Sequence, residues 1–471
     1  MNPIVARFAP SPTGLLHIGG IRTALINYIH VEKIKKQNPN SKLLLRIEDT
    51  DKIRSKDEYT KNIIEGLKWI GIKWDGEIFI QSQRKQRHKE IAYKLLNIGM
   101  AYKCICKFED LEKKRKENQK KHLNIKKLCT NCENNSEIQS LDKGYCIRIK
   151  VPDHGKISIN DKIQGSVTVQ NSEIDNYIII REDGTPTYML SVVVDDYDMG
   201  VNTIIRGDDH FNNTFRQIYI YKYMQWNIPT FSHLPLIHGE DGSKLSKRHG
   251  AVDVSILKEM GYLPQSIINN LILLGWSPKI ENEIIEIEEI IQKFEIEKLS
   301  KSSSIFNYSK LNHFNNFYLS KKKNFKYFED FVKKNSNLNK YYIKDEKKII
   351  KIFDYYKNKI NIYNDLKEII DIYFDESFKT IDNDKLNLSF NNILNEFKNY
   401  LDKIEEWNIN NVENAINKFI EEKKLEFRYF GIPMRIILTN SQNGPSISNI
   451  LDILGKKNTL LRINNYIDKC N

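Results

Sequence analysis

Cysteine is scarce in this chain, whose 471 residues include only six. Six unevenly spaced cysteines are too few for the disulfide framework of a small secreted domain. Long apolar stretches are missing as well. The longest, residues 267–276, is interrupted by Asn269 and Asn270, whereas a membrane helix needs roughly 18 apolar residues. We therefore expect neither a disulfide scaffold nor a membrane span.

Charge of both signs is abundant, with the basic side chains in excess. There are 73 Lys and Arg against 61 Asp and Glu, which gives a formal net charge of +12. Such an excess favours a polyanionic partner such as nucleic acid, because Lys and Arg that neutralise phosphates release counterions. The chain is also crowded with Asn, Ile, Tyr and Phe, and a genome biased toward A and T would raise Lys for mutational reasons. The charge balance alone leaves both explanations open.

The most informative segment is the loop of residues 10–20, Pro-Ser-Pro-Thr-Gly-Leu-Leu-His-Ile-Gly-Gly. It follows an apolar strand predicted at 4–8 and leads into a helical pattern at 21–28. Prolines stiffen the approach, glycines let backbone come close to a ligand, and the start of a helix offers unpaired N–H groups. The loop is therefore predicted to bind phosphate. Because it begins at residue 10, we expect no signal peptide and a cytoplasmic location.

The first hundred residues alternate between strand and helix patterns. An apolar strand at 42–47 ends in a burst of acidic residues, a helix follows at 59–70, and another strand is predicted at 78–80. Such alternation indicates a parallel sheet with helices on its faces. Polar residues at the carboxyl ends of its strands should face a ligand crevice.

Residues 101–184 show a different pattern. A highly charged helical run at 109–127 lies between two cysteine pairs, and alternating strand patterns follow at 145–150 and 166–169. We interpret this region as an insertion that splits the α/β domain.

The α/β pattern resumes after the insertion, at 190–194 and 203–210, and leads to a second phosphate-type loop at 244–248. Strands are scarce beyond about residue 250. From about residue 321 onward, Ile, Tyr and Phe recur at helical spacing between turns rich in Lys and Asn, which predicts a helical C-terminal part.

The two loops resemble the signatures of the class I aminoacyl-tRNA synthetases. The first is similar to the HIGH signature, present here as His17-Ile18-Gly19-Gly20, and the second to KMSKS, present here as Lys244-Leu245-Ser246-Lys247-Arg248. Further segments are similar to the bacterial glutamyl-tRNA synthetases in particular, and they are residues 7–14, 45–51, 184–188, 206–210 and 431–439. The resemblance covers most of the chain.

This resemblance implies an α/β fold: a class I Rossmann-like parallel-sheet catalytic domain, split by an acceptor-binding insertion and followed by an all-α C-terminal anticodon-binding region. The expected boundaries are 1–100 and 186–250 for the two halves of the catalytic domain, 101–185 for the inserted acceptor-stem-binding domain, 251–320 for a stem-contact helical domain, and 321–471 for the helical anticodon-binding domain.

The resemblance also implies a reaction. ATP with Mg²⁺ would activate L-glutamate to glutamyl-adenylate, and the glutamyl group would then move to the 3' end of tRNA(Glu); in the family, this activation awaits bound tRNA. We expect a monomer. The rivals of similar chemistry are a glutaminyl-tRNA synthetase, disfavoured because those enzymes end in β-barrels, and a paralogue that glutamylates a tRNA base and lacks the anticodon-binding half. A class I-like nucleotidyltransferase of a small metabolite is the rival of another class.

Activation places extra negative charge on the α-phosphorus, so positioning and charge stabilisation should dominate catalysis. We expect His17, Lys244 and Lys247 to be catalytic, because an imidazole N–H can donate to phosphate oxygens and the two lysines can reach the β and γ phosphates. An ordinary turn histidine and a solvated charged loop are the alternatives. The residues expected to bind ATP are Pro10, Ser11, Thr13, Gly14, His17, Gly19, Gly20, Lys244, Ser246, Lys247 and Arg248.

A dicarboxylic substrate needs fixed cations, and Arg offers a planar pair of donors to a carboxylate. The resemblance places Arg7 and Arg206 near the amino acid, and Glu48 where it would accept from the α-ammonium. It adds Ser11 and Tyr188 as hydroxyl partners, and these residues are expected at or just after strand ends. Arg7 as a surface cation and Glu48 in a solvated acidic turn are the alternatives. The remaining residue of this set is Ala9.

Four of the six cysteines cluster, as Cys104 with Cys106 and Cys129 with Cys132. Four thiolates suit one structural Zn²⁺. In a form common in the family, the last ligand lies two residues after the third cysteine, a position held here by Asn131, which is a poor zinc ligand. We expect Cys132 to replace it; a set of reduced thiols that bind no metal is the alternative.

Overall fold

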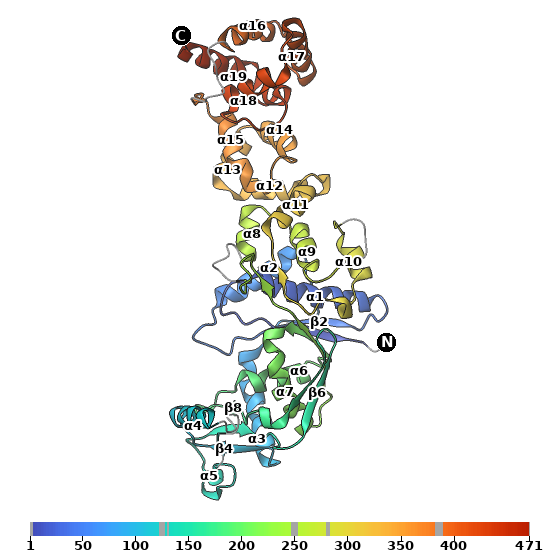
Figure 1. Ribbon diagram of the computed structural model, residues 1–471, viewed down its shortest axis with the longest axis vertical. Coiled ribbons are helices and arrows are strands. Elements are labelled where there is room, and N and C mark those ends of the chain that lie inside the picture. Colours follow the sequence, from blue (N-terminus) through green and yellow to red (C-terminus); the bar gives the residue numbers. More distant parts are fainter. Residues whose placement is uncertain are drawn as a thin grey trace. The chain divides into compact units, whose positions relative to one another are not determined.

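The computed structural model describes residues 3–121, 128–129, 131–245, 253–278, 283–381 and 390–470, with the backbone alone for Cys470. The chain divides into two compact units (Figure 1), one of residues 1–257 with 267–308 and one of residues 258–266 with 309–471. None of the helices in the described ranges combines the length and the apolar content that a membrane crossing demands.

A five-stranded parallel sheet organises the first unit, with the strand order β10-β9-β1-β2-β3. The chain enters at the middle strand, winds outward through β2 and β3, and later fills the other side with β9 and β10. In a sheet of this kind, ligands bind at the carboxyl edge where the winding reverses, here between β1 and β9. The predicted parallel sheet is confirmed. Its strands are β1 (Val5–Phe8), β2 (Lys42–Ile47), β3 (Phe79–Ile80), β9 (Thr203–Gly207) and β10 (Thr230–Leu234).

The helices around this sheet form because their apolar residues recur on one face. In α2, Ile63, Leu67 and Ile70 are buried, acidic residues occupy the first turn, and Gly71 ends the helix in a left-handed conformation with φ of 86°. Two strands, β11 (Ile237–His238) and β12 (Ser304–Ile305), make a small separate sheet. The helices up to residue 293, apart from those of the insertion, are α1 (Ile18–Lys35), α2 (Asp57–Ile70), α3 (Lys85–Asn97), α6 (Tyr188–Asp198), α7 (Phe211–Tyr223), α8 (Val254–Met260), α9 (Pro264–Ile272) and α10 (Ile287–Lys293).

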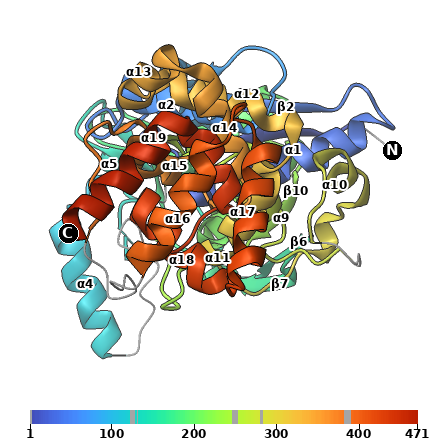
Figure 2. The same ribbon diagram turned by 90° about the horizontal axis from the view of Figure 1, so that it is seen from above.

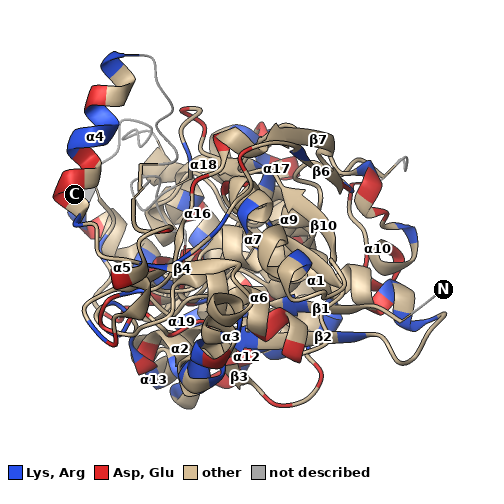
Figure 3. Ribbon diagram, turned by 90° about the horizontal axis from the view of Figure 1, so that it is seen from below, with Lys and Arg blue, Asp and Glu red and all other residues tan. Residues whose placement is uncertain are grey.

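The inserted segment contributes a three-stranded antiparallel sheet and a β-hairpin. Apolar side chains of β5, β6 and β8 share one core with those of α3, α6 and α7, so the insertion packs on the parallel domain over a wide area. Helix α4 differs, since it buries no side chain and carries Lys, Arg, Asp and Glu along its length (Figure 3). The elements are β4 (Ala101–Cys104), α4 (Phe108–Lys120), α5 (Ser136–Ser140), β5 (Cys146–Ile149), β6 (Lys156–Asp161), β7 (Gly165–Gln170) and β8 (Ile178–Ile180).

The second unit is helical throughout its described residues, as predicted (Figures 1 and 2). Its core is aromatic: Phe397, Phe419 and Phe430 are fully buried, with ring centroids 4.9–5.7 Å apart. The guanidinium of Arg462 lies 3.8 Å from the ring of Phe378. The helices are α11 (Tyr308–Leu319), α12 (Phe325–Lys334), α13 (Ser336–Lys344), α14 (Glu346–Tyr356), α15 (Leu366–Phe374), α16 (Phe390–Asp402), α17 (Ile409–Lys423), α18 (Phe427–Thr439) and α19 (Ile447–Cys470).

A buried ion network joins β1, β2 and α6 of the first unit. Asp196 on α6 accepts from Arg7 Nε at 3.0 Å and from Arg46 Nη1 at 2.6 Å, and Arg46 also pairs with Glu48 at 2.9 Å. Burial would raise the pKa of Asp196, but the two guanidinium groups outweigh it and hold that pKa below its usual value. Buried charges are tolerable only when each has its partner, so the three elements are fixed relative to one another.

We predict that Asp196→Asn destabilises the first unit by about 3–5 kcal/mol, because it leaves two buried guanidinium groups short of a counter-charge. The same substitution at the exposed Asp51, which pairs with Arg54, should change the stability far less, because exposed ion pairs contribute little. Urea unfolding followed by far-ultraviolet circular dichroism measures both. A loss at Asp196 no larger than that at Asp51 would contradict the assigned role of the network.

Candidate active site

His17 lies in the first phosphate-type loop and caps helix α1. Its backbone is extended, and its Nδ1 accepts a hydrogen bond from the backbone N–H of Gly20 at 3.2 Å. In the neutral ring the proton is therefore on Nε2, which is left to donate. A Cβ on Gly19 would lie 3.1 Å from His17 Nδ1. Glycine at this position thus makes room for the imidazole, a reason that the sequence did not reveal.

The second loop turns back tightly before Lys244. The N–H of Gly239 donates to Ser243 O at 2.9 Å, Gly242 is left-handed with φ of 75°, and the N–H of Leu245 donates to Ile237 O at 3.0 Å. Lys244 Nζ lies 3.5 Å from Asp209 Oδ2. Ser246, Lys247 and Arg248, which were predicted to bind ATP, lie outside the described residues.

The two loops act on each other electrostatically. Burial lowers the pKa of His17, and the positive charge of Lys244 lowers it further. A backbone bridge between His17 and Asp253 and a hydrogen bond from Val254 N to Leu16 O join the first loop to the chain that follows the second. Both loops therefore border one site, at the edge of the sheet where ligands bind in this fold.

The buried Arg22 fixes α1 against this region. Its Nη1 donates to Pro235 O and its Nη2 to Leu274 O, each at 2.7 Å. Burial lowers its pKa to about 10. The helix that His17 caps is thus tied to the segment that precedes Lys244, which sets the spacing of the two loops.

Arg206, on β9, is nearly completely enclosed, yet part of its guanidinium has no partner. Its Nε donates to His233 Nε2 at 3.2 Å, and its Nη2 donates to Thr214 Oγ1 at 2.7 Å and Gln217 Oε1 at 2.9 Å. Its Nη1 is buried without a hydrogen bond from any described residue. The hydroxyl of Tyr221 is likewise buried without a hydrogen bond from any described residue. Unpaired buried donors cost free energy and call for an explanation, and a bound carboxylate would supply one.

Arg7 and Glu48 are both buried. This excludes the two alternative interpretations, in which Arg7 is a surface cation and Glu48 lies in a solvated acidic turn. Arg7 uses its Nε for Asp196. Glu48 follows β2 directly, its N–H donates to Pro10 O at 3.0 Å, and its carboxylate pairs with Arg46. Burial raises the pKa of Glu48 against the effect of Arg46.

Tyr188 departs from the expectation that these residues follow strand ends. It is the first residue of helix α6, and its hydroxyl lies 3.2 Å from His210 Nδ1. The helix, and not a strand, thus sets its position. Pro10, Thr13 and Gly14 lie on the loop between β1 and α1 with Ala9 and Ser11, where the side chains of Ser11 and Thr13 are exposed.

The sequence did not reveal Arg46 and Asp196, which orient the two predicted residues Arg7 and Glu48. Asp196 lies just after the run 190–194, which indicates only an ordinary α/β element, and 150 positions separate it from Arg46. His233 and Asp161, which support Arg206, were missed for the same reason. A buried acidic pair in an otherwise apolar helix, Asp195 with Asp196, was the available signal.

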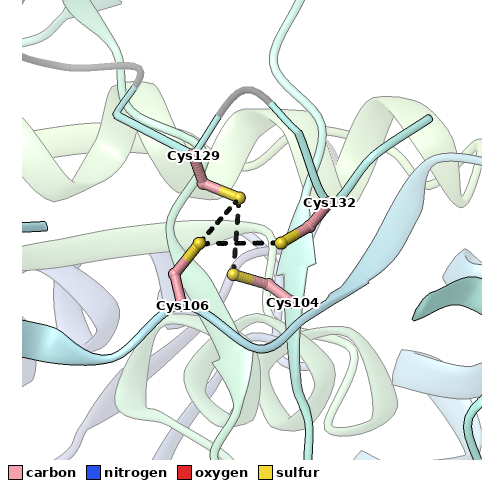
Figure 4. A group of neighbouring side chains, drawn as sticks. All are labelled: Cys104, Cys106, Cys129 and Cys132. Carbon is pink, nitrogen blue, oxygen red and sulfur yellow. Dashed lines mark hydrogen bonds between the residues drawn. The ribbon is translucent and has the colours of Figure 1, made fainter. Parts of the chain in front are cut away.

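The four clustered cysteines converge in the inserted segment (Figure 4). The sulfur atoms of Cys104, Cys106, Cys129 and Cys132 all lie within 4.8 Å of one another, and three of the pairs are 3.4–3.6 Å apart. A tetrahedral Zn²⁺ with Zn–S bonds of about 2.3 Å would need sulfurs about 3.8 Å apart. The donor set and its spacing therefore fit zinc, with Cys132 in the place for which Asn131 is unsuited.

Cys146 stands apart in sequence but lies next to this cluster. It pairs with Cys104 across β4 and β5, is buried, and donates from Sγ to Cys104 O at 3.3 Å. Arg148 Nε donates to Cys104 Sγ at 3.3 Å. Hydrogen bonds from Cys129 and Cys146 lower the pKa of Cys104, so negative charge on that sulfur is favoured.

Comparison with known proteins agrees with this geometry. Residues 3–313 match the family model described as tRNA synthetases class I (E and Q), catalytic domain, and residues 325–467 match one described as an anticodon binding domain. The fold and the two-loop site are thus those of a class I aminoacyl-tRNA synthetase.

The similar proteins narrow the class. The chain is 41% identical over 473 residues to glutamate–tRNA ligase 1 of Orientia tsutsugamushi, covering 98% of this chain and 97% of the relative. It is 39% identical to glutamate–tRNA ligase 2 of Rickettsia felis, covering 98% and 99%. The crystal structure of a glutamate tRNA ligase from Elizabethkingia meningosepticum in complex with its amino acid has a TM-score of 0.84, 27% identity and full coverage of both chains. This chain belongs to the glutamate–tRNA ligase family.

Proposed function

We propose that the protein activates L-glutamate with ATP, releasing pyrophosphate, and transfers the glutamyl group from the adenylate to the 3' end of tRNA(Glu). The observation that carries the proposal is the approach of the two loops to one strand end: the charge of Lys244 acts on His17, and Lys244 pairs with Asp209, which lies just after the strand that carries Arg206. Since charged tRNA is consumed at the ribosome, the reaction belongs to the cytoplasm.

In this scheme the nucleotide lies over the start of α1. The Nε2–H of His17 donates to phosphate oxygens, and the helix N-terminus adds its positive dipole end. Lys244 and Lys247 neutralise the β and γ phosphates together with Mg²⁺, which ATP brings. As the carboxylate oxygen attacks the α-phosphorus and pyrophosphate leaves, these donors stabilise the added charge. The loop from Pro10 through Gly14, with Gly19, Gly20, Ser246 and Arg248, completes the nucleotide site.

Glutamate would bind between β1 and β9. Arg206 offers its Nη1 to the side-chain carboxylate, with Arg7 as the second cation, and Glu48 accepts from the α-ammonium. The hydroxyls of Ser11 and Tyr188 and the backbone at Ala9 complete the contacts. A buried guanidinium prefers a carboxylate to an amide, because only the carboxylate returns a full charge. This selects glutamate over glutamine.

The remaining segments would hold tRNA, with the acceptor stem on the insertion at 101–185, the stem on 251–320 and the anticodon on 321–471. The match of 325–467 to an anticodon binding domain supports the last of these. The helical second unit argues against a glutaminyl-tRNA synthetase and against a base-modifying paralogue. A nucleotidyltransferase that acts on a small metabolite would not need a helical tRNA-binding unit.

Zinc would be held by Cys104, Cys106, Cys129 and Cys132. Its contribution would be structural: four thiolates close the coordination shell and leave no position for substrate. The ion would tie residues 104–106 to residues 129–132, so the two ends of the segment that carries α4 stay together.

The experiment that tests the function is ATP–pyrophosphate exchange with each of the twenty amino acids, with tRNA(Glu) or tRNA(Gln) present. Exchange with glutamate in the presence of tRNA(Glu) is the expected result. Activity with another amino acid and none with glutamate would refute the proposal.

We predict that His17→Ala and Lys244→Ala each lower kcat for exchange by about 10²–10³-fold, since each removes one donor that stabilises the transition state. Lys94→Ala, at an exposed position on α3, is the matched control and should leave kcat unchanged. Steady-state kinetics at saturating glutamate and ATP give the comparison. Wild-type kcat in both loop variants would mean that the nucleotide reacts elsewhere.

We also predict that the purified protein holds about one Zn²⁺ per chain. Cys132→Ser should lose most of it, because three thiolates leave the shell open. Cys146→Ser should keep it, because Cys146 is outside the four. Elemental analysis by plasma mass spectrometry gives the metal content. If wild-type protein takes up no zinc after reduction and incubation with zinc sulfate, the cluster is not a metal site.

A further inference from the structure

We propose that His233 and Asp161 form a relay that positions the guanidinium of Arg206, and that through it the inserted segment controls the affinity for the amino acid. This rests on the proposed function, in which Arg206 binds the substrate carboxylate. Neither residue touches the substrate in this scheme; both act through Arg206.

The relay is a short chain of buried groups. Asp161 Oδ2 lies 2.6 Å from His233 Nδ1, and both side chains have 0% exposure. On the other side of the ring, His233 Nε2 lies 3.2 Å from Arg206 Nε and 3.0 Å from Thr214 Oγ1. The Asp161 carboxylate, the His233 imidazole and the Arg206 guanidinium thus form a continuous hydrogen-bonded chain with no solvent between them.

The carboxylate sets the tautomer of the imidazole. With Asp161 as an acceptor, Nδ1 carries the proton, and the single lone pair of Nε2 is left to accept from the two donors in reach, Arg206 Nε at 3.2 Å and the hydroxyl of Thr214 at 3.0 Å. Burial lowers the pKa of His233, against the effect of Asp161, so the ring stays neutral. A protonated Nε2 would point a hydrogen at the N–H of Arg206 and disrupt the contact.

The relay helps to fix the orientation of the Arg206 guanidinium. A guanidinium has five N–H bonds. Nε uses its one bond for His233, and the two N–H bonds of Nη2 have three acceptors in reach, Thr214 Oγ1, Gln217 Oε1 and, at 3.4 Å, His210 O. Two of the three nitrogens are therefore anchored, which prevents the planar group from turning about its stem. Only Nη1 has no partner among the described residues, and its direction is fixed by the other two.

Asp161 reaches this site from the insertion. It ends strand β6 at the tip of the β6–β7 hairpin, where its Oδ1 accepts from the backbone N–H groups of Ile163 and Gln164. The hairpin is also bonded to β10: Lys162 N donates to Phe231 O at 2.9 Å, and Gln164 Nε2 donates to His233 O at 3.1 Å. Any shift of the hairpin on β10 moves the carboxylate that orients the ring.

The test is a set of matched variants assayed for KM and kcat by pyrophosphate exchange with tRNA(Glu) present. His233→Leu removes the acceptor and should raise the KM for glutamate about 10-fold or more, the effect of losing one hydrogen bond to a buried charge, with the KM for ATP within about twofold. His233→Gln places an amide oxygen near Nε2 and should restore most of the affinity.

Asp161→Asn keeps the size of the side chain but offers an N–H to Nδ1, which moves the ring proton to Nε2. We expect a rise in the KM for glutamate similar to that of His233→Leu. Ser158→Ala, on the exposed face of the same hairpin, is the control and should match the wild type. If His233→Leu fails to fold, the contrast between Asp161→Asn and His233→Gln decides the question.

Arg206→Lys separates this inference from the function on which it rests. If Arg206→Lys raises the KM for glutamate while folded His233→Leu and Asp161→Asn do not, the relay is wrong and the substrate assignment stands. If all three leave it unchanged, the assignment of Arg206 to the substrate is wrong. Equal losses in His233→Gln and His233→Leu would overturn the role of Nε2 as the acceptor.

Discussion

One carboxylate, that of Asp196, holds the centre of the first unit together. It lies between the guanidinium groups of Arg7 and Arg46 with almost no exposure. Strand β1 runs on from Arg7 into the loop that carries His17, and strand β2 runs on from Arg46 to Glu48. Because isolated buried charges are too costly to persist, neither strand end can shift without the other. The positions of the loop that carries His17 and of Glu48 both follow from this constraint.

The periodic features of the fold could be predicted from the sequence alone. Alternation of strands and helices indicated the parallel sheet, and helical spacing of aromatic residues indicated the second unit. The frame of proline and glycine around His17 indicated the phosphate-type loop. These features are local, since each depends on residues within about one element of one another. The partners of Arg7 and Arg206 are not local: Asp196 is 189 positions from Arg7, and His233 is 27 from Arg206.

The cysteine cluster shows both the reach and a limit of sequence reasoning. The spacing common in the family points to Asn131, but the sequence predicted Cys132 in its place, and Cys132 is the fourth sulfur of the group. A tetrahedral site depends on where each sulfur lies in space, and one extra residue in a turn can be absorbed by the backbone. Cys146, which is distant in sequence, is adjacent through the antiparallel pairing of β4 with β5. The strand register places Cys146 beside Cys104, and the spacing of cysteines along the sequence does not predict this neighbour.

The insertion packs against the elements that form the proposed amino acid site. Strands β5, β6 and β8 share their core with α6 and α7. Helix α6 carries Tyr188 and Asp196, and α7 carries Thr214 and Gln217, which anchor Arg206. The hairpin adds Asp161 to the same set. A displacement of the insertion large enough to break its packing would therefore change the orientation of Arg206 and the position of Tyr188 together. Packed cores resist small displacements, so the packing of the insertion holds Arg206 and Tyr188 in one arrangement.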